Sequence, residues 1–224
     1  MTVRVLVVDD QPIARAGIAA MLDAELDIDV AGQSADGEDA ARDALALRPD
    51  VVVTDIRMPR LDGISATRRI LAELECAVVL ITTFDDDEYL FDGIAAGASG
   101  FLLKDSGPDL LAAAVRSAAR GDSLIDPAMT RALIEQTVAP ARPEATRAPD
   151  PEQLALLDQL SERERVVLQA VARGLSNVDI AAELWVSVPT IKSHISSVLA
   201  KTGTRTRVQA AVFAYECGFM TPGA

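Results

Sequence analysis

Three carboxylates stand directly after two apolar runs of the sequence. Asp9 and Asp10 follow Val3–Val8, and Asp55 follows Val51–Thr54. Continuous β-branched runs of this kind are typical of strands that are buried on both faces of a parallel sheet. In a doubly wound sheet whose first and third strands are neighbours, the carboxyl ends of those strands meet in one crevice. We therefore expect the three carboxylates to converge.

Converging carboxylates predict a cation site that is suited to phosphoryl transfer. Like charges held close together repel each other, and a hard divalent ion such as Mg²⁺ relieves that repulsion. The ion can neutralise phosphoryl oxygens while an in-line carboxylate attacks. Thr82 ends the fourth predicted strand and Lys104 follows the fifth, so a hydroxyl and a positive charge would lie at the same edge. Each residue alone also fits an exposed loop, a strand end or a solvated lysine; their joint positions favour a functional site.

Five strand–helix units in series must position these side chains. Such a series predicts an α/β domain with a five-stranded parallel sheet of order 2-1-3-4-5 and helices on both faces. The predicted strands are Val3–Val8, Asp27–Ala31, Val51–Thr54, Ala77–Thr82 and Gly100–Leu103. The predicted helices are Arg15–Asp23, Gly37–Leu47, Ile64–Leu74, Glu88–Ala96 and Pro108–Arg120.

A second, all-helical region follows a proline-rich segment. Residues 138–151, VAPARPEATRAPDP, contain four prolines and favour an extended linker, although a loop within one domain is the alternative. Ser161 and Glu164 then have the spacing of a capping box, which begins an apolar helix. A short helix starts at Ser176, and Ser187 can cap a third, so the pattern is that of a helix-turn-helix unit. A fourth helix is expected over 207–216.

The third of these helices has one apolar and one small, polar face. The apolar face consists of Ile191, Ile195, Val198 and Leu199, and the opposite face of Ser193, Ser196, Ser197 and Ala200. Lys192 flanks the polar face on one side, and Thr190, His194 and Lys201 flank it on the other. Such a helix can enter a major groove while basic side chains reach phosphates. The alternative is that this helix only forms part of the solvated surface and binds nothing. Trp185, in the preceding turn, is expected to lie in the core.

Charge separates the two regions as well. Residues 151–224 contain seven Lys/Arg and seven Asp/Glu, so the whole net charge of −13 belongs to residues 1–150. No window approaches the roughly 18 apolar residues of a membrane span, and the N-terminus is too short for a signal peptide, so we expect a cytoplasmic protein. Cys76 and Cys217 lie far apart without metal-ligand spacing, which argues against zinc and against a disulfide.

Residues 1–120 resemble the receiver domain of two-component response regulators. The matching segments are VLVVDDQPIARAGI, VVVTDIRMPRLDGI, LITTFDDDEY and GASGFLLKD. The resemblance implies that Asp55 is the phosphoacceptor. It implies a Mg²⁺ site made by Asp9, Asp10, Asp55 and the backbone carbonyl of Arg57. It makes Thr82 the switch hydroxyl, Lys104 the phosphate-contacting lysine and Phe101 the switch aromatic, although plain core packing is an equal alternative for Phe101.

Residues 158–220 resemble the LuxR-type helix-turn-helix of the NarL/FixJ regulators. The matching stretch is LSERERVVLQAVARGLSNVDIAAELWVSVPTIKSHISSVLAKTGTRTRVQAAVFAY. The resemblance implies DNA contacts by Lys192, Ser193 and Ser196, with backbone contacts from Thr190 and Lys201. It also implies a dimer through the last helix, for which Val208, Val212 and Tyr215 are candidates; closing the domain core is the alternative for the two valines. The domain limits are then 1–122, a helix and linker over 123–155, and 156–224.

The whole sequence therefore indicates a response regulator and not an enzyme. A sensor histidine kinase would phosphorylate Asp55, and the regulator would dimerise on promoter DNA, with RNA polymerase as a further partner and no membrane. A Mg²⁺-dependent phosphohydrolase is the first alternative, but no D-x-D-x-T motif is present and the DNA-binding region would be unexplained. A receiver that acts only as a phosphate-independent interaction module is the second, and the intact acidic set argues against it.

Overall fold

The computed structural model describes residues 2–83, 88–126 and 151–220. The chain divides into two compact units, Met1–Leu133 and Ile134–Ala224, each with its own apolar core. Most of the predicted linker, residues 127–150, lies outside the described residues, as does part of the LITTFDDDEY segment. Residues 151–155, which the sequence placed with the linker, begin a helix.

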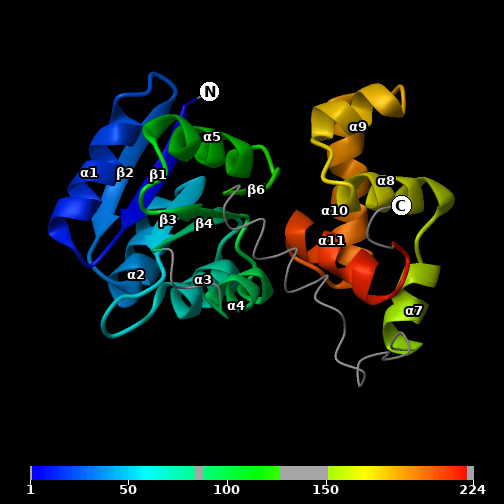
Figure 1. Ribbon diagram of the computed structural model, residues 1–224, viewed down its shortest axis with the longest axis horizontal. Coiled ribbons are helices and arrows are strands. Elements are labelled where there is room, and N and C mark those ends of the chain that lie inside the picture. The colour runs from blue at the N-terminus through cyan, green and yellow to red at the C-terminus, as the bar shows by residue number, and fades with distance from the viewer. Residues whose placement is uncertain (1, 84–87, 127–150, 221–224) are drawn as a thin grey trace. The chain divides into compact units, whose positions relative to one another are not determined.

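The first unit is an α/β domain built on one parallel sheet (Figure 1). Its strands are β1 (Val3–Val8), β2 (Ile28–Ser34), β3 (Val51–Asp55), β4 (Ala77–Thr82), β5 (Gly100–Leu103) and β6 (Leu124–Ile125). The sheet order is β2-β1-β3-β4-β5-β6, which confirms the predicted order 2-1-3-4-5. The sixth strand was not predicted, because two residues are too short to show a periodic pattern.

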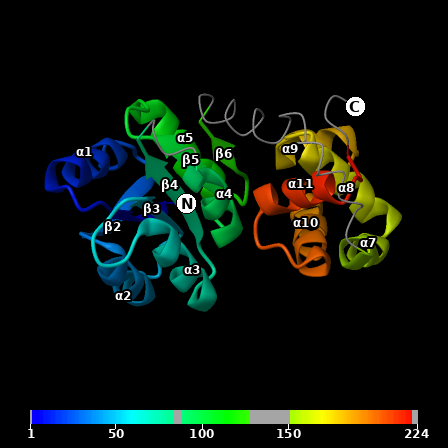
Figure 2. The ribbon, with the colours of Figure 1, turned by 60° about the horizontal axis from the view of Figure 1, so that its bottom comes forward.

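Helices cover both faces of this sheet. They are α1 (Pro12–Asp23), α2 (Gly37–Leu47), α3 (Gly63–Glu73), α4 (Glu88–Ala96) and α5 (Pro108–Ala119). Helices α1 and α5 lie on one face, and α2, α3 and α4 lie on the other (Figures 1 and 2). Since β1, β3 and β4 are covered on both sides, their residues are almost entirely buried, which explains their uninterrupted apolar sequences.

Local caps fix where α2 and α3 begin. Asp36 accepts hydrogen bonds from the backbone N–H groups of Glu38 and Asp39, and the Asp62 side chain accepts one from Ser65. Each cap satisfies N–H groups that the first turn of a helix leaves without an intrahelical partner. Both helices begin beside the edge of the sheet where the predicted site residues stand.

The second unit consists of α7 (Pro151–Asp158), α8 (Glu162–Ala172), α9 (Asn177–Glu183), α10 (Val188–Thr202) and α11 (Arg207–Glu216). The predicted capping box of Ser161 and Glu164 is present at the start of α8. Ser187 caps α10, as predicted, and Gly203 ends it with φ of 68°. Cys217 packs in the core of this unit as a free thiol, and Cys76 is a free thiol in the other.

One prediction about this unit is wrong. Trp185 does not lie in the core, because it is 94% exposed. It occupies the turn between α9 and α10 with φ of 56°, a left-handed conformation that directs the side chain away from the packed helices. Hydrophobicity alone suggested burial, whereas the backbone geometry of the turn decides where the indole goes.

Candidate functional site

The three predicted carboxylates meet at one edge of the sheet. β1 and β3 are hydrogen-bonded neighbours, so Asp9 and Asp10, which follow β1, come beside Asp55 at the end of β3. One oxygen from each of the three carboxylates lies within 4.8 Å of the others. The sheet order therefore makes one acidic cluster out of residues that are 45 positions apart in the chain.

The donor set of this cluster fits a hard divalent cation. Asp9 is fully buried and Asp55 is 6% exposed, so their charges are largely shielded from water. Among the described side chains, Asp10 Oδ1 is buried without a hydrogen-bond partner, as expected of an atom that is placed to coordinate a metal. Asp10 and Arg57 together line a surface pocket of about 490 Å³, through which small molecules can approach the cluster.

Lys104 supplies the positive charge that the sequence predicted. Its Nζ lies 2.7 Å from Asp55 Oδ2 and 2.9 Å from Asp9 Oδ2. Burial raises the pKa of Asp55; Lys104 lowers it, and the charge of Asp9 raises it further. Burial alone would lower the pKa of Lys104, but its hydrogen bonds to Asp55 and Asp9 raise the pKa overall. The lysine therefore stays charged and holds two neighbouring carboxylates together.

Thr82 and Phe101 lie behind this cluster on the two following strands. Thr82 ends β4 with 1% exposure, and the Lys104 backbone N–H donates to its carbonyl oxygen over 2.7 Å. Phe101, on β5, is fully buried. Its ring occupies space left by Gly93 of α4, where a Cβ atom would come within 2.7 Å of the ring. The glycine thus makes room for the aromatic side chain in its buried position.

The structure adds a contact that the sequence did not reveal. Arg60, in the loop after Asp55, forms an ion pair with the buried Asp36 and reaches Asp39 at 3.1 Å. Arg60 has φ of 66°, and the Leu61 carbonyl accepts a hydrogen bond from the N–H of Gly37. These contacts fix the loop that carries Arg57 to the start of α2. The only sequence signal was the capping position of Asp36, which says nothing about its partner.

A second unpredicted contact joins the Lys104 loop to the last strand of the domain. Ser106 Oγ donates a hydrogen bond to Asp126 Oδ2 over 2.6 Å, and Asp126 N–H donates to the carbonyl oxygen of Phe101. Asp126 is 7% exposed and is the last described residue before the linker. The loop of Lys104, the strand of Phe101 and the start of the linker are therefore connected by hydrogen bonds.

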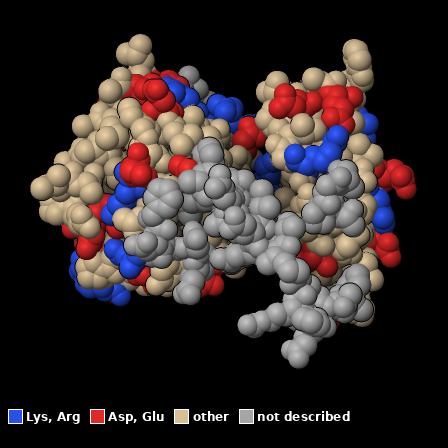
Figure 3. All heavy atoms as spheres, in the orientation of Figure 1, with Lys and Arg blue, Asp and Glu red and all other residues tan. Residues whose placement is uncertain are grey.

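In the helical unit, the exposed face of α10 is the one predicted except at Ser197, which is half-buried and donates to Glu164. Ile191, Ile195 and Val198 are buried, while Lys192 and Ser196 are exposed, as are Thr190 and Ser193. Figure 3 shows Lys and Arg mixed with Asp and Glu on the visible face of each unit. A small, polar helix face with few cations suits entry into a DNA groove better than non-specific electrostatic binding to DNA.

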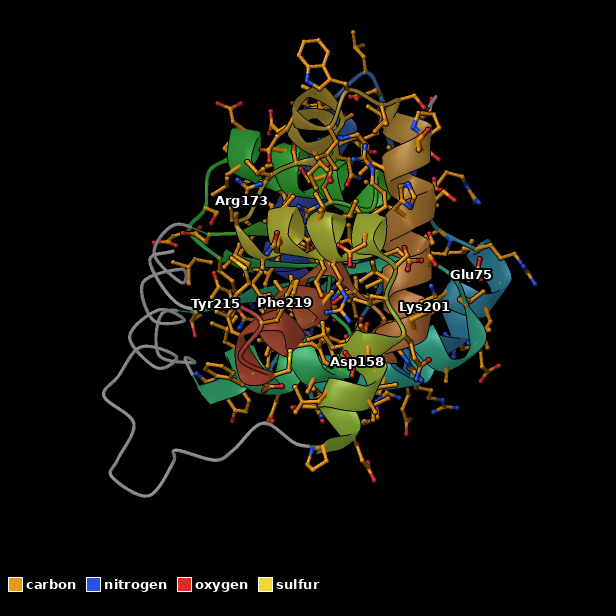
Figure 4. All side chains as sticks on the ribbon, turned by 90° about the vertical axis from the view of Figure 1, so that its right-hand side faces the viewer. Glu75, Asp158, Arg173, Lys201, Tyr215 and Phe219 are labelled. Carbon is orange, nitrogen blue, oxygen red and sulfur yellow. The ribbon has the colours of Figure 1, made fainter. Side chains whose placement is uncertain are left out.

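Lys201 does not match its predicted role well. Its Nζ lies 2.7 Å from Glu164 Oε2 and 2.9 Å from Oε1, and Ser197 also donates to that carboxylate. These interactions lower the pKa of Glu164 to about 2, with the Lys201 hydrogen bond as the largest cause. Figure 4 labels Lys201 near the C-terminal end of α10. Its ammonium group joins α10 to α8, which competes with binding a phosphate.

The three predicted dimer residues differ in exposure. Val208 is only 8% exposed, in keeping with its alternative role in closing the domain, and Val212 is half-buried. Tyr215 is half-buried and donates a hydrogen bond from its hydroxyl to the carbonyl oxygen of Ala172. Tyr215 and Lys201 lie on opposite sides of the helical unit in Figure 4. A surface around Tyr215 would thus lie on the other side of the helical unit from Lys201.

Comparisons with known proteins agree with this arrangement. Residues 5–116 match the response regulator receiver domain, and residues 158–214 match the bacterial regulatory proteins of the luxR family. The chain is 40% identical to the uncharacterized transcriptional regulatory protein YxjL of Bacillus subtilis, over 97% of each chain. It is 36% identical to the transcriptional regulatory protein LiaR of Bacillus subtilis, over 95% of this chain and 97% of LiaR. The crystal structure of the response regulator ChrA, from a heme-sensing two-component system, is similar with a TM-score of 0.54 and 32% sequence identity. The match covers 98% of this chain and 99% of the ChrA chain.

Proposed function

Because the chain belongs to the two-component response regulators with a LuxR-type DNA-binding domain, we propose that phosphorylation of Asp55 controls its binding to promoter DNA. The chain is a regulator of transcription and not an enzyme, since both of its domains belong to regulatory families. Convergence of Asp9, Asp10, Asp55 and Lys104 at one edge of the sheet is the observation that carries the proposal.

The acidic cluster provides the parts of a phosphoacceptor site. Asp9 and Asp10, with the carbonyl of Arg57, would hold Mg²⁺, which supplies charge neutralisation for the phosphoryl oxygens when bound. A carboxylate oxygen of Asp55 attacks the phosphorus atom of the donor, and the bond from phosphorus to the donor breaks. Lys104, already 2.7 Å from Asp55, then moves its hydrogen bond to a phosphoryl oxygen.

The acyl phosphate would act on the buried residues behind it. The hydroxyl of Thr82 is drawn to a phosphoryl oxygen, which vacates space next to Phe101 and lets the aromatic ring repack. Moving a two-state equilibrium from mostly off to mostly on requires roughly 5 kcal/mol of differential stabilisation. Several new charge-assisted hydrogen bonds, each worth about 1.5–3 kcal/mol, are of that order.

The output is proposed to be sequence-specific binding to double-stranded promoter DNA. Lys192, Ser193 and Ser196 face the groove, and Thr190 reaches the backbone. Serine side chains are short, so we expect water and DNA shape to supply much of the specificity. A homodimer through Val212 and Tyr215 would match two half-sites about one helical turn apart.

The partners, the location and the domain limits follow from the same family membership. A sensor histidine kinase donates the phosphoryl group, and RNA polymerase is a further partner at the promoter. Among the described residues, no helix combines the length and the apolar character needed to cross a membrane. We place the regulator in the cytoplasm, where its promoter DNA is. The sequence-based limits are 1–122 for the receiver, 123–155 for the linker region and 156–224 for the DNA-binding domain; we extend the receiver to include β6 and begin the DNA-binding domain with α7.

Phosphorylation with acetyl phosphate and Mg²⁺ tests the assignment of Asp55. The wild-type chain should gain one phosphoryl group by mass spectrometry, and Asp55→Asn should gain none while keeping its circular dichroism spectrum. Asp105→Asn, an exposed carboxylate beside Lys104, is the matched control and should be phosphorylated normally. Phosphate retained by the Asp55 variant would refute the acceptor assignment.

DNA binding separates the proposal from its alternatives. A duplex enriched from a random-sequence pool should bind more tightly after phosphorylation, and this gain should disappear in Asp55→Asn. Equal affinity with and without the phosphodonor would instead identify a phosphate-independent interaction module. Steady release of phosphate from a phosphomonoester would favour a phosphohydrolase.

A further inference from the structure

Trp185 has no packing role in the helical domain. It is the only tryptophan of the chain, and 94% of it is exposed. Tryptophan has a large apolar surface and is highly buried on average in folded proteins. Its φ of 56° is also uncommon for a bulky side chain, which pays a conformational cost in the left-handed region. Neither local conformation nor core packing therefore explains a tryptophan here.

The turn that carries Trp185 is held from several sides. The backbone N–H of Val186 donates to the carbonyl oxygen of Ala181 over 3.0 Å. The N–H of Trp185 donates to the carbonyl oxygen of Ala182 over 3.4 Å. The Arg163 guanidinium of α8 donates to the carbonyl oxygen of Leu184 over 2.9 Å. The backbone that carries the indole is thus held by hydrogen bonds, two residues before Ser187, which caps α10.

The surroundings of the turn favour an anionic partner. Arg163 brings its positive charge to the turn, and Lys192 stands exposed in the second turn of α10. The nearest acidic residue along the chain, Glu183, is paired with Arg173 at 2.6 Å. An exposed indole next to a turn that holds a guanidinium can pack on a sugar and donate its N–H to a phosphate oxygen.

We propose that Trp185 and Arg163 bind the sugar–phosphate backbone of double-stranded DNA at the wall of the groove that α10 enters. The inference rests on the proposed function and extends its interface from α10 to the preceding turn. The indole packs against a deoxyribose and its N–H donates to a phosphate oxygen, while Arg163 supplies charge. Such contacts fix how α10 lies on the duplex without reading bases.

The single tryptophan reports its own environment in the full-length protein. The chain is phosphorylated with acetyl phosphate and Mg²⁺, and the probe is a duplex enriched from a random-sequence pool. Free protein should show emission that acrylamide quenches strongly, because Trp185 is exposed. Bound duplex should change the emission and protect it from acrylamide. Emission that stays fully quenchable in the complex would overturn the inference.

Two substitutions separate DNA contact from folding. Trp185→Gly should keep or raise the melting temperature, because glycine adopts positive φ readily, yet weaken DNA binding roughly tenfold, the loss of about one good contact. Arg163→Gln retains a donor for Leu184 and should lower the salt dependence of log K by about 0.9, as expected for one lost phosphate contact. Val178→Ala, which removes another exposed apolar side chain from α9, is the control and should bind DNA normally.

Three further results would show whether Trp185 binds DNA, another protein or a second copy of this chain. Unchanged DNA affinity in Trp185→Gly would overturn the inference and assign the indole to a protein surface. Protection of the emission by raising the protein concentration without DNA would also overturn it, in favour of a second copy of the chain. Failure of the phosphorylated wild type to bind any duplex would refute the proposed function itself. If Lys192→Ala loses DNA binding while Trp185→Gly and Arg163→Gln keep it, only this inference is refuted.

Discussion

Glu164 shows how one side chain can serve two parts of a domain. It closes the capping box with Ser161 at the start of α8, and it also accepts hydrogen bonds from Ser197 and Lys201 of α10. The carboxylate is buried, so its negative charge depends on these partners. The ion pair therefore attaches the DNA-reading helix to the first helix of the core.

Removing only the charge of Glu164 should weaken the helical domain. Glu164→Gln can still cap the helix but loses the pairing with Lys201, so we expect a loss of roughly 1–3 kcal/mol at pH 7. The folded-state pKa of about 2 lies below the ordinary 4.5 of glutamate, so this stabilisation is complete above pH 4.5 and is lost as the pH falls toward 2. Denaturant unfolding followed by far-UV circular dichroism should show the two proteins converging over that range.

The neighbouring carboxylate gives a control for this measurement. Glu162 lies in the same first turn of α8 but is exposed, so Glu162→Gln should change the unfolding free energy little. A difference between Glu164→Gln and wild type that stays constant down to pH 2 would contradict the ion-pair explanation.

At the scale of the elements, the loop between β3 and α3 is the most constrained segment near the site. Gly63 opens α3 and donates its N–H to the carbonyl oxygen of Ile56 over 2.9 Å. A Cβ atom at Gly63 would lie 2.0 Å from the carbonyl oxygen of Asp55, and one at Gly37 would lie 2.4 Å from that of Leu61. The close approach of these backbones positions the end of β3 against two helix starts.

Two glycine substitutions should therefore shift the stability of the receiver in opposite directions. Gly63→Ala should lower the free energy of unfolding by roughly 1–3 kcal/mol, because the added methyl group overlaps the Asp55 carbonyl. Gly17→Ala, in α1, meets no atom within 4 Å and should raise it by about 0.5–1 kcal/mol through helix propensity. Urea titrations monitored by circular dichroism measure both, and equal shifts of the two variants would count against the backbone contact.

At the scale of the whole molecule, the chain consists of two units with separate cores. The acidic cluster lies in the first unit, and the only tryptophan lies in the second. A ligand that binds only the native form of one unit stabilises that unit alone if the two unfold separately. Calorimetry, which records the heat absorbed in each unfolding transition, then shows which unit the ligand stabilises.

Magnesium should accordingly stabilise one unfolding transition and leave the other unchanged. At a Mg²⁺ concentration about 100 times the dissociation constant, the receiver should gain about 2.7 kcal/mol, while the transition of the helical unit stays in place. Asp10→Asn should abolish the gain because it removes a ligand, and Asp105→Asn should keep it. Differential scanning calorimetry with and without Mg²⁺ provides the comparison, and a gain that persists in Asp10→Asn would exclude the proposed site.

The sequence by itself determined the features that depend on neighbouring residues. Apolar runs defined four of the first five strands, and the polar residue at or after the end of three of them, Asp55, Thr82 or Lys104, followed directly from its position. The second strand has a polar sequence, and it extends to Ser34 where the prediction ended at Ala31. The adjacency of β1 and β3 came from the strand order that a series of right-handed strand–helix units favours. The capping box of Ser161 and Glu164 and most of the exposed face of α10 were equally local, which is why these features were predicted.

Only the tertiary structure decided which charges pair and which apolar groups are exposed. Lys201 looked like a DNA-binding cation but pairs with Glu164, 37 residues earlier, and Arg207 donates to Asn177 in the interior. Such partners are brought together by helix packing, so no local spacing reveals them. Trp185 is 94% exposed although tryptophan is usually buried, and its left-handed φ of 56° belongs to a turn whose geometry depends on where α9 ends and α10 begins.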